Sequence, residues 1–399
     1  MQKLRLKDLD VKGEKVLIRV DFNVPLSNEG AITDDTRIRE ALPSIQHVIR
    51  HGGIVILMSH LGRPKGKKEP KYSLAPCQKK LSELLGQPVY FVEDCIGPEV
   101  EKKVMQLKPG DILLLENLRF YPAEEDPSID PTFAEKLARL GDLYVNDAFG
   151  TAHRKHSSTT LVADYFPKRA ATGFLMEKEL HYLSELLLTP KRPFYAIIGG
   201  AKVSTKIGVL RALLDKVDHL FIGGAMAYTF FHLLGISMGD SPVELDCLEE
   251  AKLFLEASRK KNIRLSLPKD LTIAKHFSND AESQVISSEK GIPPGWQGMD
   301  IGPRTLEEWT IALQKAATLF WNGPVGVFEF PNFSNGTFAL AKAIAQLPAI
   351  TVVGGGDSVA AISSLGITGD FDHISTGGGA SLEFIELGHL VGIDALSNA

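Results

Sequence analysis

The chain has 399 residues, of which 44% are hydrophobic and 23% are charged, as is typical of soluble globular proteins. Its length suits two domains, and its net charge of −5 argues against a nucleic-acid partner. Three separated cysteines without metal-ligand spacing fit a reducing compartment. We find neither the apolar core of a signal peptide nor an apolar run long enough to span a bilayer, so we expect a cytoplasmic protein without a membrane partner.

Short, β-branched apolar runs alternate with helix-like segments along the whole chain. Runs of this kind predict parallel strands covered on both faces. In the first half, the expected strands are 16–20, 54–58, 89–92, 112–115 and 143–145. In the second half, they are 194–198, 219–222, 264–267, 318–321, 350–353 and 373–375. Because the pattern occurs twice, we expect an α/β fold with two parallel sheets.

A helical pattern of apolar residues at 176–187 separates the two halves, and Pro190 and Pro193 follow it. It predicts a linking helix or hinge at 176–190. The first domain would then cover residues 1–175, and the second would begin at residue 191.

Ligands of parallel sheets bind beyond the carboxyl ends of the strands. In the first half, these ends carry four arginines with histidines nearby: Arg37, Arg63, Arg119 and Arg154, with His60, His153 and His156. A guanidinium fork matches phosphate and carboxylate groups. Each arginine alone could be a solvated loop charge, but four at equivalent places favour a small anionic substrate. Asp21 and Asn23 could bind a substrate hydroxyl or cap the turn before Pro25.

Two glycine triplets, 354–356 and 377–379, each follow an expected strand and precede a helix-like stretch. Glycines at such a turn let backbone N–H groups approach a phosphate, and the helix N-terminus adds positive charge. Asp357 closes the first triplet. It could meet phosphates through Mg²⁺, cap the expected helix 358–365, or do both.

Lys202 and Lys206 lie four residues apart after another glycine pair. If a helix begins at Val203, both lysines share its first turn, where they oppose the helix dipole. This placement favours contact with a phosphate, although both could extend into solvent. Glu329 could bind a ribose hydroxyl or be a surface residue.

Several familiar motifs are absent. The sequence contains no P-loop, no G-x-G-x-x-G and no zinc spacing. An NAD fingerprint and a standard NTPase are therefore both disfavoured.

Eight segments together resemble the signatures of the phosphoglycerate kinase family, in the family's order. They are Arg19–Pro25, Ser59–Pro64, Leu115–Phe120, Gly150–Arg154, Gly199–Lys206, Trp321–Glu329, Gly354–Asp357 and Ser375–Ser381. The resemblance implies two Rossmann-like three-layer domains with parallel sheets, joined by the linking helix and a C-terminal crossover. It also implies reversible, Mg²⁺-dependent phosphoryl transfer between 1,3-bisphosphoglycerate with ADP and 3-phosphoglycerate with ATP, by a monomer.

The resemblance also implies roles for individual residues. Those that would hold 3-phosphoglycerate are Asp21, Asn23, Arg37, His60, Arg63, Arg119 and Arg154. Those that would hold the nucleotide phosphates and ribose are Lys202, Lys206, Glu329, Gly354, Gly355, Gly356, Asp357 and Ser358, with Mg²⁺ at Asp357. Gly223, Gly224, Gly302 and Asn322 would line the adenosine pocket. The second domain would end at residue 385, and the tail 386–399 would pack back on the first.

The acceptor of the reverse reaction is a carboxylate, which needs no base to remove a proton. We therefore expect catalysis by positioning and charge stabilisation. The groups expected around the transferred phosphoryl are Arg37, Lys202 and the amides of Gly377, Gly378 and Gly379, with Lys206 on the nucleotide phosphates. The alternatives are another α/β enzyme for anionic ligands, such as a dehydrogenase or a different small-molecule kinase, and a catalytically silent nucleotide-binding homologue.

Overall fold

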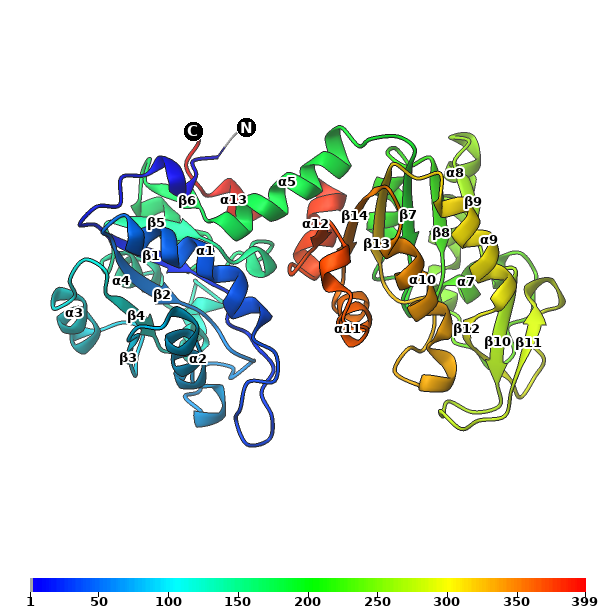
Figure 1. Cartoon of the computed structure of the whole chain (residues 1–399), viewed down its shortest axis with the longest axis horizontal. Coiled ribbons are helices and arrows are strands. Elements are labelled where there is room, and N and C mark those ends of the chain that lie inside the picture. The colour runs from blue at the N-terminus through cyan, green and yellow to red at the C-terminus, as the bar shows by residue number, and fades with distance from the viewer. Residues whose placement is uncertain (1–2) are drawn as a thin grey trace. The chain divides into compact units, whose positions relative to one another are not determined.

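The computed structural model describes residues 3–399 and divides into two compact units (Figure 1). Unit 1 comprises the described residues up to 181 together with 389–399, and unit 2 comprises residues 182–388. Helix α5 (Phe174–Leu188) carries the chain from unit 1 into unit 2.

Unit 1 is built on a six-stranded sheet with the order β3-β4-β2-β1-β5-β6. All its pairings are parallel. The strands are β1 Lys15–Arg19, β2 Ile54–Met58, β3 Tyr90–Val92, β4 Ile112–Leu115, β5 Leu143–Asn146 and β6 Ala170–Thr172. Arg19 is in register with Met58 and with Asn146, so the central strands end together at one edge.

Helices bury both faces of this sheet. They are α1 Thr36–Arg50, α2 Ala75–Leu85, α3 Pro98–Met105 and α4 Phe133–Ala138. Val16 and Ile18 of β1 pack in one buried cluster with residues of α1 and α2. Leu17 points the other way, into a cluster with residues of α3 and α4. Burial on both sides explains the continuous apolar runs.

The C-terminal residues belong to unit 1. Lys3 pairs with Asn398, and the amide of Leu4 donates to the carbonyl of Ser397 over 2.8 Å. Leu396 is buried in the same cluster as α3 and α4, beyond the short helix α13 (Val391–Asp394). Both ends of the described chain therefore contribute to this unit.

Unit 2 repeats the construction with a second six-stranded parallel sheet, of order β15-β14-β13-β7-β8-β9. Its strands are β7 Phe194–Ile198, β8 His219–Ile222, β9 Arg264–Ser266, β13 Thr318–Asn322, β14 Ile350–Gly354 and β15 His373–Ile374. Asn322 is in register with Ile198 and Gly354, so β7, β13 and β14 also end side by side.

The helices of unit 2 are α6 Ile207–Leu213, α7 Met226–Leu233, α8 Leu248–Lys260, α9 Pro303–Leu313, α10 Asn335–Ala345, α11 Gly356–Ser364 and α12 Gly379–Leu387. Trp321 and Val353 pack in one core cluster with residues of α9, α10 and α11. Helix α12 packs on α6, and α7 and α6 each pack on α8. The prediction of two parallel-sheet α/β halves is confirmed.

The sequence-predicted strands all occur, with bounds that differ by at most a residue. Two features were not predicted. One is the edge strand β6, and the other is a three-stranded antiparallel sheet in unit 2. This sheet consists of β10 Asp270–Ala274, β11 Ser283–Ser287 and β12 Gln297–Ile301.

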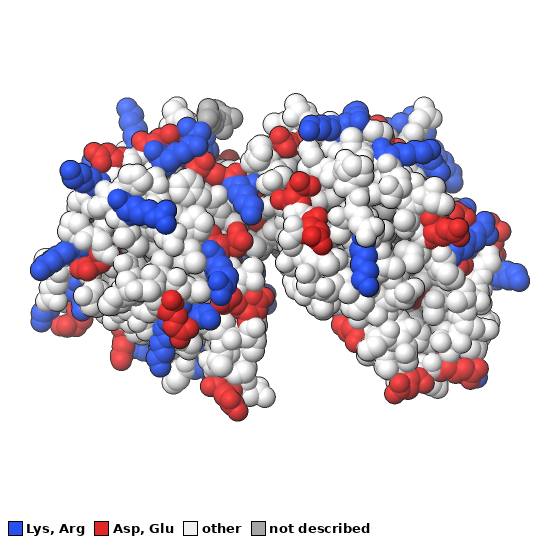
Figure 2. All heavy atoms as spheres, in the orientation of Figure 1, with Lys and Arg blue, Asp and Glu red and all other residues white. Residues whose placement is uncertain are grey.

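Acidic and basic side chains are interspersed on the visible face of each unit (Figure 2). None of the helices within residues 3–399 combines the length and apolar character that a membrane span requires.

Candidate functional site

Asp21 lies just beyond β1 in unit 1 and forms the acidic centre of the first candidate site. Its carboxylate accepts a hydrogen bond from Arg37, in the first turn of α1, and lies 3.8 Å from Nδ1 of His60. Burial alone would raise the pKa of Asp21, but the charges around it hold the pKa below its ordinary value. Asp21 is therefore ionised and paired with Arg37.

Gly62 joins two of the predicted substrate residues. Its amide donates to Oδ1 of Asn23 over 2.8 Å, and its carbonyl accepts from Nη1 of Arg119 over 2.8 Å. Gly62 has φ +61°, and a Cβ there would lie 2.5 Å from the ring of Tyr72. Both conditions require glycine. The loops after β1, β2 and β4 are thus tied together at one point.

The charges of Arg119 and Arg154 act on a second histidine, His156. Burial, then the charges of Arg19, Arg119 and Arg154, lower the pKa of His156 to about 3. The environment of His60 is similar. Burial lowers the pKa of His60 well below 6.5, and the charges of Arg19, Arg119 and Arg37 lower it further. The carboxylate of Asp21 acts in the opposite direction. Both histidines are neutral at pH 7. The positive charge of this site comes from guanidinium groups.

The structure thus brings together most of the residues predicted at the first-half strand ends. Arg154 is half-buried, with Nε 3.3 Å from Nε2 of His153. Arg63 is exposed. Arg19, at the end of β1, was not predicted as a site residue although it is fully buried behind His60. An arginine inside an apolar strand was the signal that could have identified it.

Unit 2 has a cavity of about 310 Å³ at the ends of β7, β13 and β14. Its lining residues are Gly200, Ala201, Lys202, Thr205, Lys206, Asn322, Gly323, Gly355, Gly356 and Asp357. Nζ of Lys206 donates to Oδ1 of Asn322. Burial lowers the pKa of Lys206, against the attraction of Asp357. Two lysines, one carboxylate and a glycine turn therefore face one space.

No helix begins at Val203, so Lys202 and Lys206 do not share a first helical turn. Residues 203–206 form a turn in which the amide of Lys206 donates to the carbonyl of Val203 over 2.8 Å, and α6 starts at Ile207. Lys206 is the N-cap residue, and Lys202 lies before the turn, exposed. A Cβ on Gly199, before Lys202, would lie 2.2 Å from the carbonyl oxygen of Pro324, so this glycine allows the chain to pass close to the loop after β13.

The glycine turn after β14 also differs from the expected capping. Helix α11 begins at Gly356, with Gly355 at the N-cap in a conformation of φ +91°. Asp357 therefore lies in the first turn, where a carboxylate favours the helix dipole, and it is not the cap. The hydroxyl of buried Ser358 accepts from the amide of Gly323 over 2.6 Å, which ties this turn to β13.

Asn322 is the most informative residue of the cavity. Its Nδ2 is buried and has no hydrogen-bond partner among residues 3–399. A Cβ at Gly355 would lie 3.0 Å from this nitrogen, so any other residue at 355 would press on it. A buried donor without a partner costs about 1–3 kcal/mol, so Asn322 is suited to bind an acceptor such as a phosphate oxygen.

The other residues predicted for the nucleotide do not line this cavity. Gly224 has φ +67°, and a Cβ there would lie 2.6 Å from the carbonyl oxygen of Gly200. A Cβ at Gly223 would press on the Val325 side chain, and one at Gly302 would lie 2.2 Å from the Asp270 carboxyl group. Each glycine thus permits close packing. Glu329 is exposed.

The second glycine triplet leads into α12, whose first residue is Gly379. The amide of Gly377 donates to Oγ of Ser375 over 3.1 Å, while Gly378 is the N-cap residue with φ +53°. No atom lies within 4 Å of a Cβ placed on Gly378. The amide of Gly377 would have to leave Ser375 to meet a ligand.

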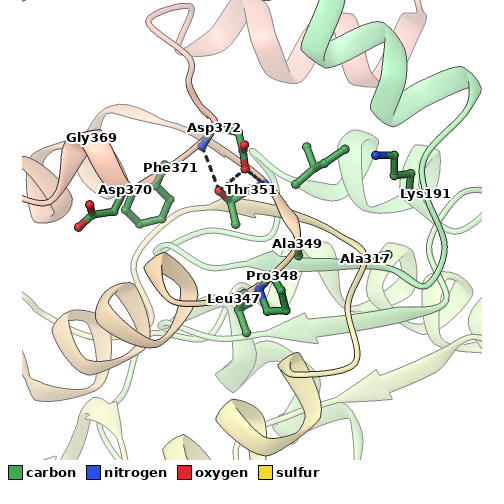
Figure 3. Close-up of a pocket in the computed structure, with 11 residues that line it drawn as sticks. Lys191, Ala317, Leu347, Pro348, Ala349, Thr351, Gly369, Asp370, Phe371 and Asp372 are labelled. Atoms are coloured by element: carbon green, nitrogen blue, oxygen red, sulfur yellow. Dashed lines mark hydrogen bonds between the residues drawn. The ribbon is translucent and has the colours of Figure 1, made fainter.

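A second hollow of unit 2, of about 450 Å³, lies at the opposite edge of the sheet (Figure 3). Ala317, Ala349 and Asp372 directly precede β13, β14 and β15, so this hollow faces the amino ends of the strands. The Asp372 carboxylate is already bound to the amide and hydroxyl of Thr351. The carboxyl edge therefore remains the better ligand site.

Residues 3–399 contain no group of three or more His, Cys, Asp or Glu side chains that could hold a metal ion. Asp357 is a single carboxylate beside the cavity at the ends of β7, β13 and β14, and Mg²⁺ is commonly held by one or two carboxylates together with substrate phosphates.

Comparison with known proteins gives one consistent answer. The family model described as phosphoglycerate kinase matches residues 6–387. The phosphoglycerate kinase of Moorella thermoacetica is 53% identical over 397 residues and covers 100% of both chains. The cytosolic phosphoglycerate kinase of Nicotiana tabacum is also 53% identical, over 99% of this chain and 98% of its own.

Solved structures agree. The phosphoglycerate kinase of Coxiella burnetii superposes with a TM-score of 0.88 at 41% identity, and that of Pyrococcus horikoshii with a TM-score of 0.86 at 36% identity. Each comparison covers 98% of both chains.

Proposed function

Because the chain belongs to the phosphoglycerate kinase family, we propose that its two cationic sites hold the two substrates of a reversible phosphoryl transfer. The protein is a glycolytic phosphotransferase whose acceptor is a carboxyl group. The proposal concerns which residues of this chain bind each substrate and how they act.

The site of unit 1 binds 3-phosphoglycerate. The guanidinium groups around His60 and His156 offer the charge and fork geometry that a phosphate and a carboxylate need. Asp21 and Asn23 accept from substrate hydroxyls, and Arg63 closes on the substrate from its exposed position. The residues are Asp21, Asn23, Arg37, His60, Arg63, Arg119 and Arg154.

The cavity of unit 2 binds the phosphates of ADP or ATP. The unpartnered Nδ2 of Asn322, beside the ammonium group of Lys206, carries this assignment. Asn322 is therefore assigned to the nucleotide phosphates, whereas the family resemblance had placed it in the adenosine pocket. Asp357 would hold Mg²⁺ with phosphate oxygens, and the ion would neutralise their charge when bound. Gly223, Gly224, Gly302 and Glu329 remain the residues proposed for the nucleoside.

Transfer itself needs little proton chemistry, because the acceptor carboxylate is ionised at neutral pH. The residues of this chain act by holding the reacting oxygens in line and by stabilising the charge of the phosphoryl in flight. We assign that charge stabilisation to Arg37, Lys202 and Lys206, with the amides of Gly378 and Gly379 and, once it leaves Ser375, of Gly377.

The two substrates bind to different units, so the reacting atoms must be brought together by domain closure, which would also exclude water and suppress ATP hydrolysis. We place the substrate domain at 1–175, the hinge at 176–190, the nucleotide domain at 191–385 and the returning tail at 386–399. We also propose that the protein is a cytoplasmic monomer. The tobacco relative is named cytosolic.

One assay tests the function: ATP formation from ADP and 1,3-bisphosphoglycerate, with and without Mg²⁺. We expect turnover that requires Mg²⁺. Nucleotide binding without turnover would identify a silent homologue, and turnover only with another carboxylate or hydroxyl acceptor would identify a different small-molecule kinase.

A further inference from the structure

A buried polar network lies directly behind His60 in unit 1. It consists of Arg19, at the end of β1, and of Ser158 and Glu124 from two later loops, all fully buried. Burying an arginine and a glutamate is costly unless both are paired and hydrogen-bonded. The hydrogen bonds of Arg19, Ser158 and Glu124 must therefore offset the cost of their burial.

Ser158 links the two charges. Its hydroxyl accepts from Nε of Arg19 over 2.8 Å and donates to Oε1 of Glu124 over 2.6 Å. Oε2 of Glu124 accepts from the amide of Ser158 over 3.0 Å. Nη2 of Arg19 lies 3.8 Å from Oε1 of Glu124, and Nη1 donates to the carbonyl of Val20. The guanidinium plane is thus fixed by contacts at all three nitrogens.

The remaining contact of Nη2 is to the catalytic site. It lies 3.2 Å from Nδ1 of His60. A guanidinium offers only donors and stays protonated, so Nδ1 must be the acceptor and carries no proton. The Asp21 carboxylate is 3.8 Å from the same nitrogen, which is beyond hydrogen-bond distance. The ring is then neutral, with its proton on Nε2.

We propose that Arg19, Ser158 and Glu124 are positioning residues that hold His60 as the neutral Nε2–H tautomer, so that the ring presents one defined donor to the anionic substrate. The substrate part of this proposal rests on the proposed function. The tautomer part does not, because it follows from contacts within the ligand-free protein. All three side chains of the network are fully buried, so we expect their effect on a substrate to pass through the ring of His60.

The first test is the ring ¹⁵N spectrum of the full-length, ligand-free protein at neutral pH. The spectrum of His60→Gln identifies the His60 signals by their loss. We expect an unprotonated Nδ1 and a protonated Nε2. An Nδ1–H tautomer or a doubly protonated ring would overturn the proposal. Because no substrate is present, this result is independent of whether the protein transfers phosphoryl.

The second test is Ser158→Ala, which removes the hydroxyl between Arg19 and Glu124. We expect KM for 3-phosphoglycerate to rise about three- to tenfold, as loss of one ordinary hydrogen bond would give, with a smaller change in kcat. The His60 ring signals should shift towards a tautomer mixture. Ser158→Thr keeps the hydroxyl and should restore both readouts.

Ser157→Ala is the matched control, because the Ser157 hydroxyl donates over 2.6 Å to the carbonyl of Ala123, outside the network. We expect His60 signals and KM as in the unmodified protein. Equal changes in both alanine variants would indicate a general packing effect and overturn the proposal. If Ser158→Ala does not fold, the ring spectrum of the unmodified protein still decides. If the protein shows the expected tautomer but has no kinase activity, the proposed function is contradicted and the tautomer assignment stands.

Discussion

Replacing Lys206 by methionine separates catalysis from stability in unit 2. The change removes the ammonium group that donates to Asn322 and that Asp357 attracts, while keeping a side chain of similar length. A lost contact to the charge that develops on a transferred phosphoryl costs about 3 kcal/mol. We therefore expect kcat/KM for ATP to fall at least about 100-fold.

Folding stability should change much less. Burial lowers the pKa of Lys206 in the folded protein, so its charged form costs stability below the folded pKa, and this cost disappears as the pH rises towards 10.5. Methionine removes the cost but loses the Asn322 hydrogen bond, worth about 0.5–1.5 kcal/mol. These effects oppose each other. The free energy of unfolding should stay within about 1 kcal/mol of the unmodified protein.

The assay pairs coupled ATP kinetics with urea unfolding of the ligand-free protein. Lys342→Met, at an exposed lysine on α10, is the matched control and should retain full kcat/KM. Near-normal kcat/KM in folded Lys206→Met would refute the assignment. An activity loss that only follows a loss of fold would also contradict the reasoning.

Three further predictions concern Lys202, Asp357 and Asp300. Lys202→Ala should lower kcat about 100-fold or more, while calorimetry shows ADP affinity within about tenfold of normal; an unchanged kcat would remove Lys202 from the transfer step. Asp357→Asn should raise the Mg²⁺ concentration for half-maximal rate at least about tenfold, and an unchanged requirement would exclude Asp357 as the metal ligand. Burial raises the pKa of Asp300 from 3.8 to about 7, so its stabilising effect is present below 3.8 and lost as the pH rises through 7. Asp300→Asn should flatten the pH dependence of urea unfolding across that window, and an unchanged slope would contradict this account.

The parallel strands could be predicted because both faces of each sheet are buried, which produces runs such as Ile54–Met58. The sheet of β10, β11 and β12 gave no such signal. Strand β11 is largely exposed, and β12 contains Gly298, which must be glycine because a Cβ would lie 2.1 Å from the Tyr228 hydroxyl. Strand β6 was missed because two of its three residues are alanines, which are depleted in strands and do not form a β-branched run.

Side chains that follow strands within a few residues, as Asp21 follows β1 and Asp357 follows β14, could be placed at the strand ends from the sequence. The site was not predictable where function depends on local backbone geometry. The delayed start of α6 and the N-cap at Gly355 depend on φ angles and close backbone contacts that sequence spacing does not report. Arg19 was missed for a different reason. Its partners, Ser158 and Glu124, are distant in sequence and meet it only after folding.

The pairing of Lys3 with Asn398 has a consequence for how the chain is made. Unit 2 lies within a single continuous stretch, 182–388, while unit 1 needs residues from both ends of the chain. On a ribosome, the sheet of unit 1 is therefore synthesised first, but unit 1 cannot acquire its complete set of contacts until the segment that follows unit 2 has been made. Until Leu396 emerges, the cluster beneath α3 and α4 lacks one of its buried members, so unit 1 cannot be completed before all of unit 2 has been translated.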